Sequence, residues 1–207
     1  MGGDRMNQRD LDIVADIQRF RVMSRDLIAE LHFKNVKNPI TAANYVLKRL
    51  HRDQRISRST ERRQYIYFPF EKSIKKDSTK IPHFLAVCNF YTELCNIEKP
   101  KIFNVEPKFE KGFPEPDAFF IWRGAPFYLE LQRTKYSAKQ FLEKVQRYDH
   151  YYLSKEFEKE RWQPADKKYF PSVWVTGEVG YNVGVRSYRI IQASVEEMLI
   201  MMNKQRK

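Results

Sequence analysis

Apolar residues recur at helical spacing through the first fifty positions of the chain. Between residues 10 and 20 an apolar side chain falls at every third or fourth position, which is typical of an amphipathic helix. Ser24, a favourable N-cap, precedes a second such stripe, and Pro39, which suits the first turn of a helix, precedes a third at residues 40–52. The inward positions are Leu11, Ile13, Val14, Ile17 and Phe20, then Leu27, Ile28 and Leu31, and finally Ile40, Ala43, Val46, Leu47 and Leu50. The pattern predicts three consecutive helices.

The outward face of the third predicted helix is polar and basic. Periodicity leaves on it Thr41, Asn44, Tyr45, Lys48 and Arg52. Lys48, Arg49 and Arg52 supply positive charge near the end of the helix, where we expect contacts with the DNA backbone. Side chains of these types reach base edges or phosphates in a major groove. Residues 55–68 then alternate in a way that predicts a hairpin, and its basic residues include Arg58, Arg62 and Arg63. Three helices and a basic hairpin predict a winged helix-turn-helix over residues 1–70 that binds double-stranded DNA. The alternative interpretation is a small helical subdomain with a solvated basic face.

The second part of the chain has a different pattern. Residues 71–80 are rich in lysine and poor in apolar residues, which indicates a basic linker. Residues 82–97 form a strongly apolar helix that we expect a sheet to cover, so that a second domain spans residues 81–207. Its strands are expected at 101–109, 117–122, 127–132, 172–176 and 188–193, and its other helices at 138–153 and after Ser194. The chain is therefore expected to be an α+β protein with two domains.

Charge and composition narrow the classes of partner. The net charge is +12 and the pI is about 9.6, which favours binding to a polyanion such as nucleic acid. The apolar runs are too short to cross a bilayer and no signal-like series opens the sequence, so we expect a cytoplasmic protein without a membrane partner. Two cysteines and four scattered histidines lack the spacing of a zinc site.

Polar residues of two neighbouring predicted strands form a candidate metal-binding constellation. Asp117 begins one strand, and Glu130 and Gln132 share one face of the next. This arrangement resembles the PD-(D/E)xK nuclease superfamily, in which a carboxylate and an acid-x-lysine pair hold a metal ion against the scissile phosphate. The resemblance implies a restriction-endonuclease-like α/β fold, with Asp117 and Glu130 as ligands of Mg²⁺ or Mn²⁺ and with Glu106 as a possible further acid.

The departure from that motif is Gln132, which stands where the superfamily usually has lysine. Glutamine orients water but brings no charge, so full activity requires Lys144 or Lys135 to substitute from elsewhere. The alternative is that the acids only cap a strand end or pair with Arg133 and Arg147, in an inactive nuclease fold.

The order of these motifs resembles the replication-relaxation family of Gram-positive plasmids and mobile elements. The matching segments are the winged helix, Pro116-Asp117, residues 130–134 (ELQRT) and residues 144–148 (KVQRY). That family usually has aspartate at the position of Gln132. The resemblance implies a DNA-binding role in plasmid replication, relaxation or mobilisation, with replication or mobilisation proteins as partners.

Three functions follow from these patterns. The leading one is a DNA-binding accessory or regulatory protein whose nuclease-like domain is inactive. The alternative is a metal-dependent endonuclease or nickase that uses Asp117, Glu130, Gln132 and Lys144. The third is a docking or dimerisation platform with an exposed aromatic patch of Tyr148, Tyr151, Tyr152 and Trp162. We also expect a homodimer, because winged-helix proteins on palindromic sites are commonly dimers.

Overall fold

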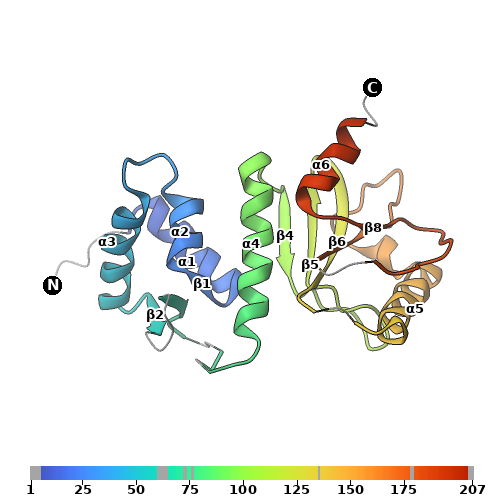
Figure 1. Cartoon of the computed structure of the whole chain (residues 1–207), viewed down its shortest axis with the longest axis horizontal. Coiled ribbons are helices and arrows are strands. Elements are labelled where there is room, and N and C mark those ends of the chain that lie inside the picture. Colours follow the sequence, from blue (N-terminus) through green and yellow to red (C-terminus); the bar gives the residue numbers. More distant parts are fainter. Residues whose placement is uncertain are drawn as a thin grey trace. The chain divides into compact units, whose positions relative to one another are not determined.

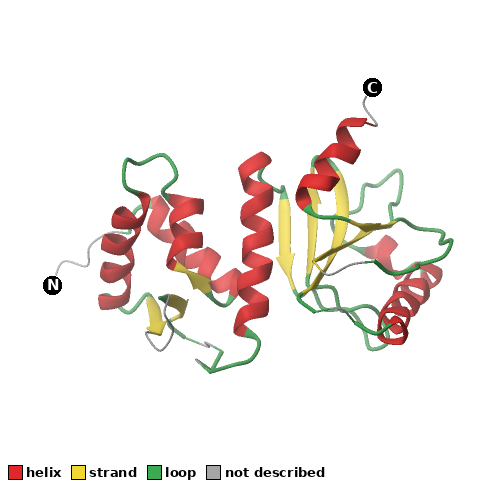
Figure 2. Ribbon diagram, in the orientation of Figure 1, coloured by secondary structure: helices red, strands yellow, loops and turns green. Residues whose placement is uncertain are grey.

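The protein is a mixed α+β structure with two compact units. The computed structural model describes residues 6–59, 65–71, 74–75, 77–134, 136–177 and 180–204, and these contain six α-helices and two sheets (Figures 1 and 2). The units are Met1–Asn96 and Ile97–Lys207. None of the helices in the described ranges combines the length and the apolar character needed to cross a membrane.

The N-terminal unit begins with the three helices that the sequence predicts. Its elements are α1 (Gln8–Phe20), β1 (Met23–Ser24), α2 (Arg25–His32), α3 (Pro39–Arg52), β2 (Ile56–Ser59), β3 (Ile66–Pro69) and α4 (Ile81–Ile97). Asn7 and Asp10 form a reciprocal capping box at the start of α1, and the Ser24 hydroxyl accepts a hydrogen bond from the Leu27 amide at the start of α2. Local capping therefore fixes where these helices begin.

A small antiparallel sheet with the strand order β1-β3-β2 accompanies the helices. Met23 pairs with Tyr67, and Ile56 pairs with Pro69. The expected hairpin is thus formed by β2 and β3, whereas β1 lies where the sequence predicts only a connection. Residues 60–64, including Arg62 and Arg63, lie outside the described residues.

The core of the N-terminal unit includes residues from α4 as well as from the first three helices. The Phe20 and Tyr91 rings lie 5.2 Å apart, and the Arg19 guanidinium lies 4.4 Å from the Tyr91 ring centroid. The boundary between the two units accordingly falls at the C-terminal end of α4, between Asn96 and Ile97, whereas we expected it before this helix. Leu11 and Ile40 were expected to face inward, but they are 45% and 40% exposed. Each lies at the margin of an apolar stripe that the remaining positions complete.

The C-terminal unit is built on a five-stranded mixed sheet with the order β4-β5-β6-β7-β8. Its elements are β4 (Ile102–Val105), β5 (Ala118–Trp122), β6 (Ala125–Gln132), α5 (Ala138–Ser154), the 3₁₀ helix η1 (Glu156–Lys159), β7 (Ser172–Gly177), β8 (Ile190–Gln192) and α6 (Val195–Lys204). Strands β4, β5 and β6 are antiparallel, and β6, β7 and β8 are parallel. A parallel connection needs a long crossover, which α5 and the segment after it supply between β6 and β7.

Helix α5 packs on one face of this sheet through an aromatic cluster. Phe141, Val145, Tyr148 and Tyr151 from α5 join Phe119 and Tyr128 from the strands, together with Val173 and Val175. Tyr148 and Tyr151 are each only 1% exposed, and Tyr152 and Trp162 pack against the cluster. The expected exposed aromatic patch of these four residues is therefore wrong, because the strand and loop residues beneath α5 cover it.

Candidate functional site

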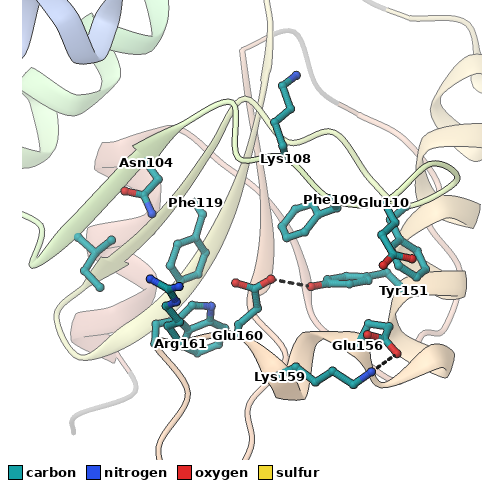
Figure 3. Close-up of a pocket in the computed structure, with 13 residues that line it drawn as sticks. Asn104, Lys108, Phe109, Glu110, Phe119, Tyr151, Glu156, Lys159, Glu160 and Arg161 are labelled. Carbon is teal, nitrogen blue, oxygen red and sulfur yellow. Dashed lines mark hydrogen bonds and ion pairs between the residues drawn. The ribbon is translucent and has the colours of Figure 1, made fainter.

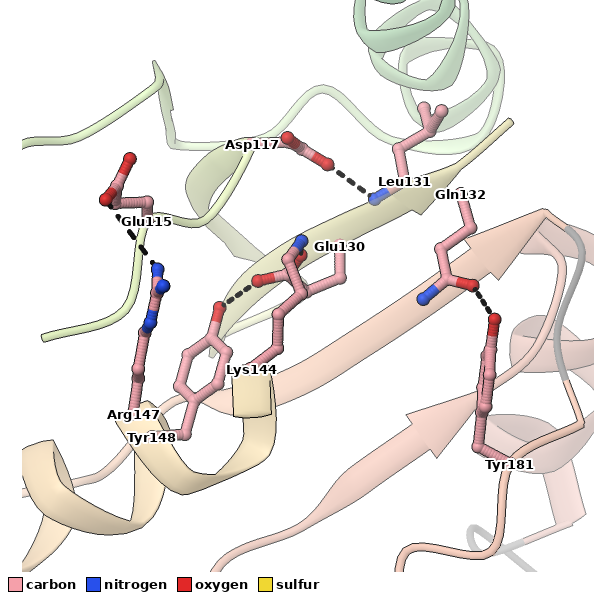
Figure 4. Close-up of polar contacts among 9 residues, drawn as sticks. All are labelled: Glu115, Asp117, Glu130, Leu131, Gln132, Lys144, Arg147, Tyr148 and Tyr181. Carbon is pink, nitrogen blue, oxygen red and sulfur yellow. Dashed lines mark hydrogen bonds and ion pairs between the residues drawn. The ribbon is translucent and has the colours of Figure 1, made fainter. Parts of the chain in front are cut away.

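The two carboxylates of the candidate site lie at the β5–β6 hairpin. Asp117 precedes β5, and its amide donates to the Leu129 carbonyl. Its carboxylate accepts a hydrogen bond of 2.7 Å from the Leu131 amide on β6 (Figure 4). The amide of Glu106 donates to the Asp117 carbonyl, so this third acid is adjacent in the backbone network. The pairing of β5 with β6 thus holds Asp117 beside the strand that carries Glu130.

Glu130 is buried under α5, where two side chains contact it. It is 3% exposed, and its face of β6 is the one that α5 covers. The Lys144 ammonium forms an ion pair with Oε2, and the Tyr148 hydroxyl donates to Oε1 at 2.7 Å (Figure 4). Lys144 and Tyr148 are one helical turn apart, so the same face of α5 presents both donors. The structure therefore brings together Asp117, Glu130 and Lys144.

Burial controls the electrostatics of this cluster. Loss of solvent raises the pKa of Glu130, and the nearby charge of Asp117 adds to this effect, while Lys144 opposes it. Burial acts to lower the pKa of Lys144, but the charges of Glu130 and Asp117 outweigh it and leave that pKa above its usual value. Burial and the Glu130 carboxylate together raise the pKa of Tyr148 well above the ordinary range. Lys144 is therefore charged at neutral pH and Tyr148 is a neutral donor.

Gln132 lies at the end of β6 and is held by a tyrosine from a distant loop. Its side-chain oxygen accepts a hydrogen bond of 2.6 Å from the Tyr181 hydroxyl, which in turn accepts from the Tyr136 amide. Gln132 is 2% exposed, and no described residue accepts from its amide nitrogen. On β7, Gly177 pairs with Gln132 at φ +101°, and a Cβ there would lie 1.9 Å from the Gln132 carbonyl oxygen. The strand ends therefore require glycine beside Gln132.

The donor set does not fit a bound divalent cation as it is arranged. Mg²⁺ is usually held by one or two carboxylates with waters and substrate phosphates, so the number of acids would suffice. Both oxygens of Glu130, however, already accept from Lys144 and Tyr148. Within the described residues no group of three or more His, Cys, Asp or Glu side chains is placed to hold a metal ion. A cation at Glu130 would have to compete with the Lys144 ammonium for the same carboxylate.

Arg147 was expected to pair with one of the site acids, but it contacts a different carboxylate. Its guanidinium lies 3.7 Å from the carboxylate of Glu115, and both side chains are half or more exposed (Figure 4). Such a pair contributes little to stability. The partner of Glu130 is instead Lys144, which is why the buried carboxylate needs no arginine.

A second candidate site is the outward face of α3. Thr41, Asn44, Lys48 and Arg52 are exposed, and Tyr45 is 75% exposed. Their spacing places them along one side of the helix, while Ala43, Leu47 and Leu50 on the other side are buried. Arg52 donates to Asp53 at the end of the helix and lowers the pKa of that carboxyl. This face presents a hydroxyl, an amide, an aromatic ring and cations to solvent.

Arg49 does not belong to this face. Its guanidinium contacts both oxygens of the Asp10 carboxylate at 2.8 Å, and Asp10 is only 1% exposed. Asp10 also accepts from the Asn7 amide as part of the α1 capping box. The pair connects α3 to α1, so we correct the expectation that Arg49 contacts DNA: it stabilises the helical core.

Arg58 is the remaining predicted DNA contact that the structure describes. It lies on β2, and its guanidinium is 4.9 Å from the centroid of the Tyr65 ring. A guanidinium over an aromatic ring is attracted to the face of that ring. Arg58 is thus on the hairpin, as expected, whereas Arg62 and Arg63 fall outside the described residues.

Sequence reasoning missed three residues of these sites. Asp10 and Tyr181 lie far along the chain from their partners Arg49 and Gln132, and no local pattern links them. Tyr148 was detectable, because its spacing of four from Lys144 places both on one helix face.

Comparisons of the chain with protein-family models, with curated proteins and with solved structures find no match. The role of each unit must therefore be inferred from the side chains described above.

Proposed function

We propose that this chain is a double-stranded-DNA-binding accessory or regulatory protein whose N-terminal unit is a winged helix-turn-helix. The observation that carries the proposal is the exposed face of α3. Its amide, hydroxyl, aromatic and basic side chains stand on one side of a helix whose other side is buried. A major groove about 12 Å wide admits a helix, and these side-chain types read its base edges and phosphates.

The order of elements supports this proposal. Three helices are followed by the β2–β3 hairpin, and β1 adds to the same sheet. A recognition helix with an adjacent hairpin is the arrangement that contacts a groove and the flanking backbone together. Arg58 on β2 would then contact phosphate beside the groove. The net charge of +12 favours the same partner, because each phosphate contact releases counterions.

A binding titration with single variants tests this proposal. Asn44→Ala should relax sequence preference, since a bidentate contact to a base contributes about 1–3 kcal/mol of discrimination. Lys48→Ala should weaken binding to every duplex and reduce the salt slope by about 1. Asn203→Ala on α6 and Lys139→Ala on α5 are matched controls at exposed helical positions. If the α3 variants bind like these controls, the proposal is wrong.

We propose further that the C-terminal unit is a nuclease-like domain without catalytic activity. The contacts of Lys144 and Tyr148 with the two Glu130 oxygens support this, because the Lys144 ammonium already neutralises the carboxylate that a metal ion would need. Supercoiled plasmid incubated with the protein and Mg²⁺ or Mn²⁺ should stay intact. Cleavage that disappears in Glu130→Ala would instead establish the endonuclease alternative.

The resemblance to replication-relaxation proteins leads us to propose a plasmid or mobile element as the setting, with replication or mobilisation proteins as partners. For a palindromic site we also propose a homodimer. Light scattering should then give twice the chain mass of 25.0 kDa. A mass of one chain at micromolar concentration, with and without DNA, would contradict the dimer but not DNA binding.

A further inference from the structure

A large cavity opens in the C-terminal unit away from Glu130. Its volume is about 740 Å³, which lies within the range of small-molecule sites, about 300–1,000 Å³. It lies between strands β4 and β5, the loop that follows β4, and the segment around η1. Neither the α3 face nor the Asp117–Glu130–Lys144 cluster contributes to it, so a ligand here is independent of the proposed DNA binding.

Aromatic rings form two opposite walls of this cavity. Phe119 and Trp162 lie 4.9 Å apart between ring centroids on one side, and Phe109 and Tyr151 lie 5.0 Å apart on the other. In Figure 3 the Phe119 ring and the Phe109 and Tyr151 rings stand on either side of the Glu160 carboxylate. Phe119 and Tyr151 are only 4% and 1% exposed, so they support the walls from behind, whereas the half-buried Trp162 and Phe109 present their rings to the cavity. Aromatic rings placed in this way can bind a flat ring by stacking.

Glu160 supplies the acceptor between these walls. The Tyr151 hydroxyl approaches its Oε1 at 3.5 Å, the limit of a hydrogen bond, and no described residue donates to its other oxygen. Because a carboxylate has acceptor sites on both oxygens, it suits a ligand with two adjacent N–H donors. The nearby Glu156 pairs with Lys159 at 2.6 Å instead (Figure 3). Glu160 and the exposed Glu110 thus remain to meet a ligand, and Glu160 is the one whose carboxylate lies between the aromatic walls (Figure 3).

Two cations, Lys108 and Arg161, also line the cavity and are exposed. Neither has a partner among the described residues, so both can meet a negatively charged group. An organic cation would also suit the aromatic walls and Glu160. The lining holds three acids, Glu110, Glu156 and Glu160, and three cations, Lys108, Lys159 and Arg161, so its own charge is balanced. The net charge of +12 on the whole chain then favours a ligand that carries a phosphate over an organic cation.

We propose that this cavity binds the guanine base of a nucleotide, with the base between the two aromatic walls. Guanine is the base whose N1–H and N2–H groups form two adjacent donors, which match the two oxygens of Glu160. Its phosphate would lie toward Lys108 and Arg161. The nucleotide is either free or part of a single strand, and the chemistry of recognition is the same for both.

Tryptophan fluorescence provides the test. Trp122 and Trp174 are fully buried, whereas Trp162 lines the cavity, so a ligand should quench Trp162 selectively. Guanosine monophosphate should quench saturably, and uridine monophosphate should bind at least tenfold more weakly. Glu160→Gln should lower the affinity for guanosine monophosphate at least tenfold. Glu158→Gln, on the same segment but outside the cavity lining, should leave that affinity unchanged. Arg161→Ala should lower the affinity for guanosine monophosphate but not for guanosine, which has no phosphate.

A second titration separates the two sources. The second ligand is an oligothymidylate that carries one guanine. If it binds much more tightly than the mononucleotide, the site is for a single strand, and if the two affinities are equal, the site is for the free nucleotide. Absence of saturable quenching by both ligands, equal affinity for guanosine and uridine monophosphates, or an unchanged Glu160→Gln variant would overturn the proposal. Quenching by choline that Glu160→Gln abolishes would also overturn it, in favour of an organic cation. None of these results bears on the α3 face.

Discussion

Lys144→Met isolates the contribution of the ion pair under α5. The substitution keeps an unbranched side chain of similar length but leaves the Glu130 carboxylate, which is 3% exposed, with the Tyr148 hydroxyl as its remaining donor among the described residues. Removal of one partner of a buried pair typically costs about 3–5 kcal/mol. Because the Lys144 side chain is 30% exposed, water reaches this site in part, and we expect a loss of about 3 kcal/mol in the free energy of unfolding.

The loss should depend on pH with a definite sign. Burial already raises the pKa of Glu130, and removal of Lys144 removes the charge that opposes this rise. A carboxyl whose pKa is higher in the folded state destabilises the fold only once it ionises, so the loss is small below its unfolded pKa of about 4.3. It grows as the pH rises through the raised pKa of the folded state. The deficit should therefore be larger at pH 8 than at pH 5.

Urea unfolding followed by tryptophan fluorescence measures this effect in the correct unit, since Trp122, Trp162 and Trp174 all lie in the C-terminal unit. Lys139→Met, at an exposed position of α5, is the matched control and should change the free energy by less than about 0.5 kcal/mol. Glu130→Gln combined with Lys144→Met removes both charges and should recover most of the loss. A loss below about 1 kcal/mol at pH 8, or one independent of pH, would refute the reasoning.

Three further changes have expected outcomes. Gly177→Ala should lower the free energy of unfolding of the C-terminal unit by at least about 2 kcal/mol, because the new Cβ would meet the Gln132 carbonyl. Gly112→Ala is the control: Gly112 has a similar φ but lies in open space, so the same urea assay should show a smaller loss. Arg49→Met should lower the free energy of unfolding of the N-terminal unit by about 3 kcal/mol, because it leaves the buried Asp10 carboxylate without the Arg49 guanidinium. Unfolding followed by circular dichroism measures this loss, and an unchanged free energy would contradict the core role of the pair. Burial raises the pKa of the Cys88 thiol, so iodoacetamide at pH 8 should modify the half-buried Cys95 before Cys88. Mass spectrometry measures the order of labelling, and preferential labelling of Cys88 would show that α4 opens.

Local signals predicted most element positions because the decisive residues are neighbours in sequence. Ser24 caps α2, Pro39 begins α3, and the hydrophobic stripe of α3 ends near Arg52. Strand β1 was missed because two residues are too few to show an alternating pattern. The grouping of α4 was missed because its contact between Phe20 and Tyr91 joins positions 71 residues apart.

The candidate site was predictable in its strand residues and less so in its partners. Alternation along β6 correctly placed Glu130 and Gln132 on one face, and Lys144 was among the residues expected near them. The sequence did not show that Lys144 would form an ion pair with Glu130, nor that the Tyr181 hydroxyl would donate to Gln132. Both contacts depend on how α5 and a later loop cross the sheet. The ion pair of Arg49 was not foreseen for the same reason: its partner Asp10 lies on another helix.

Amide chemical-shift mapping during a titration with duplex DNA is the most direct test of recognition by α3. Shifts should concentrate at the exposed positions Thr41, Asn44, Tyr45, Lys48 and Arg52, extend to Arg58 on β2, and diminish as salt is raised. Amides of the C-terminal strands β4–β8 should change little. Shifts that avoid α3, or that are confined to the C-terminal unit, would contradict the proposal that this helix reads DNA.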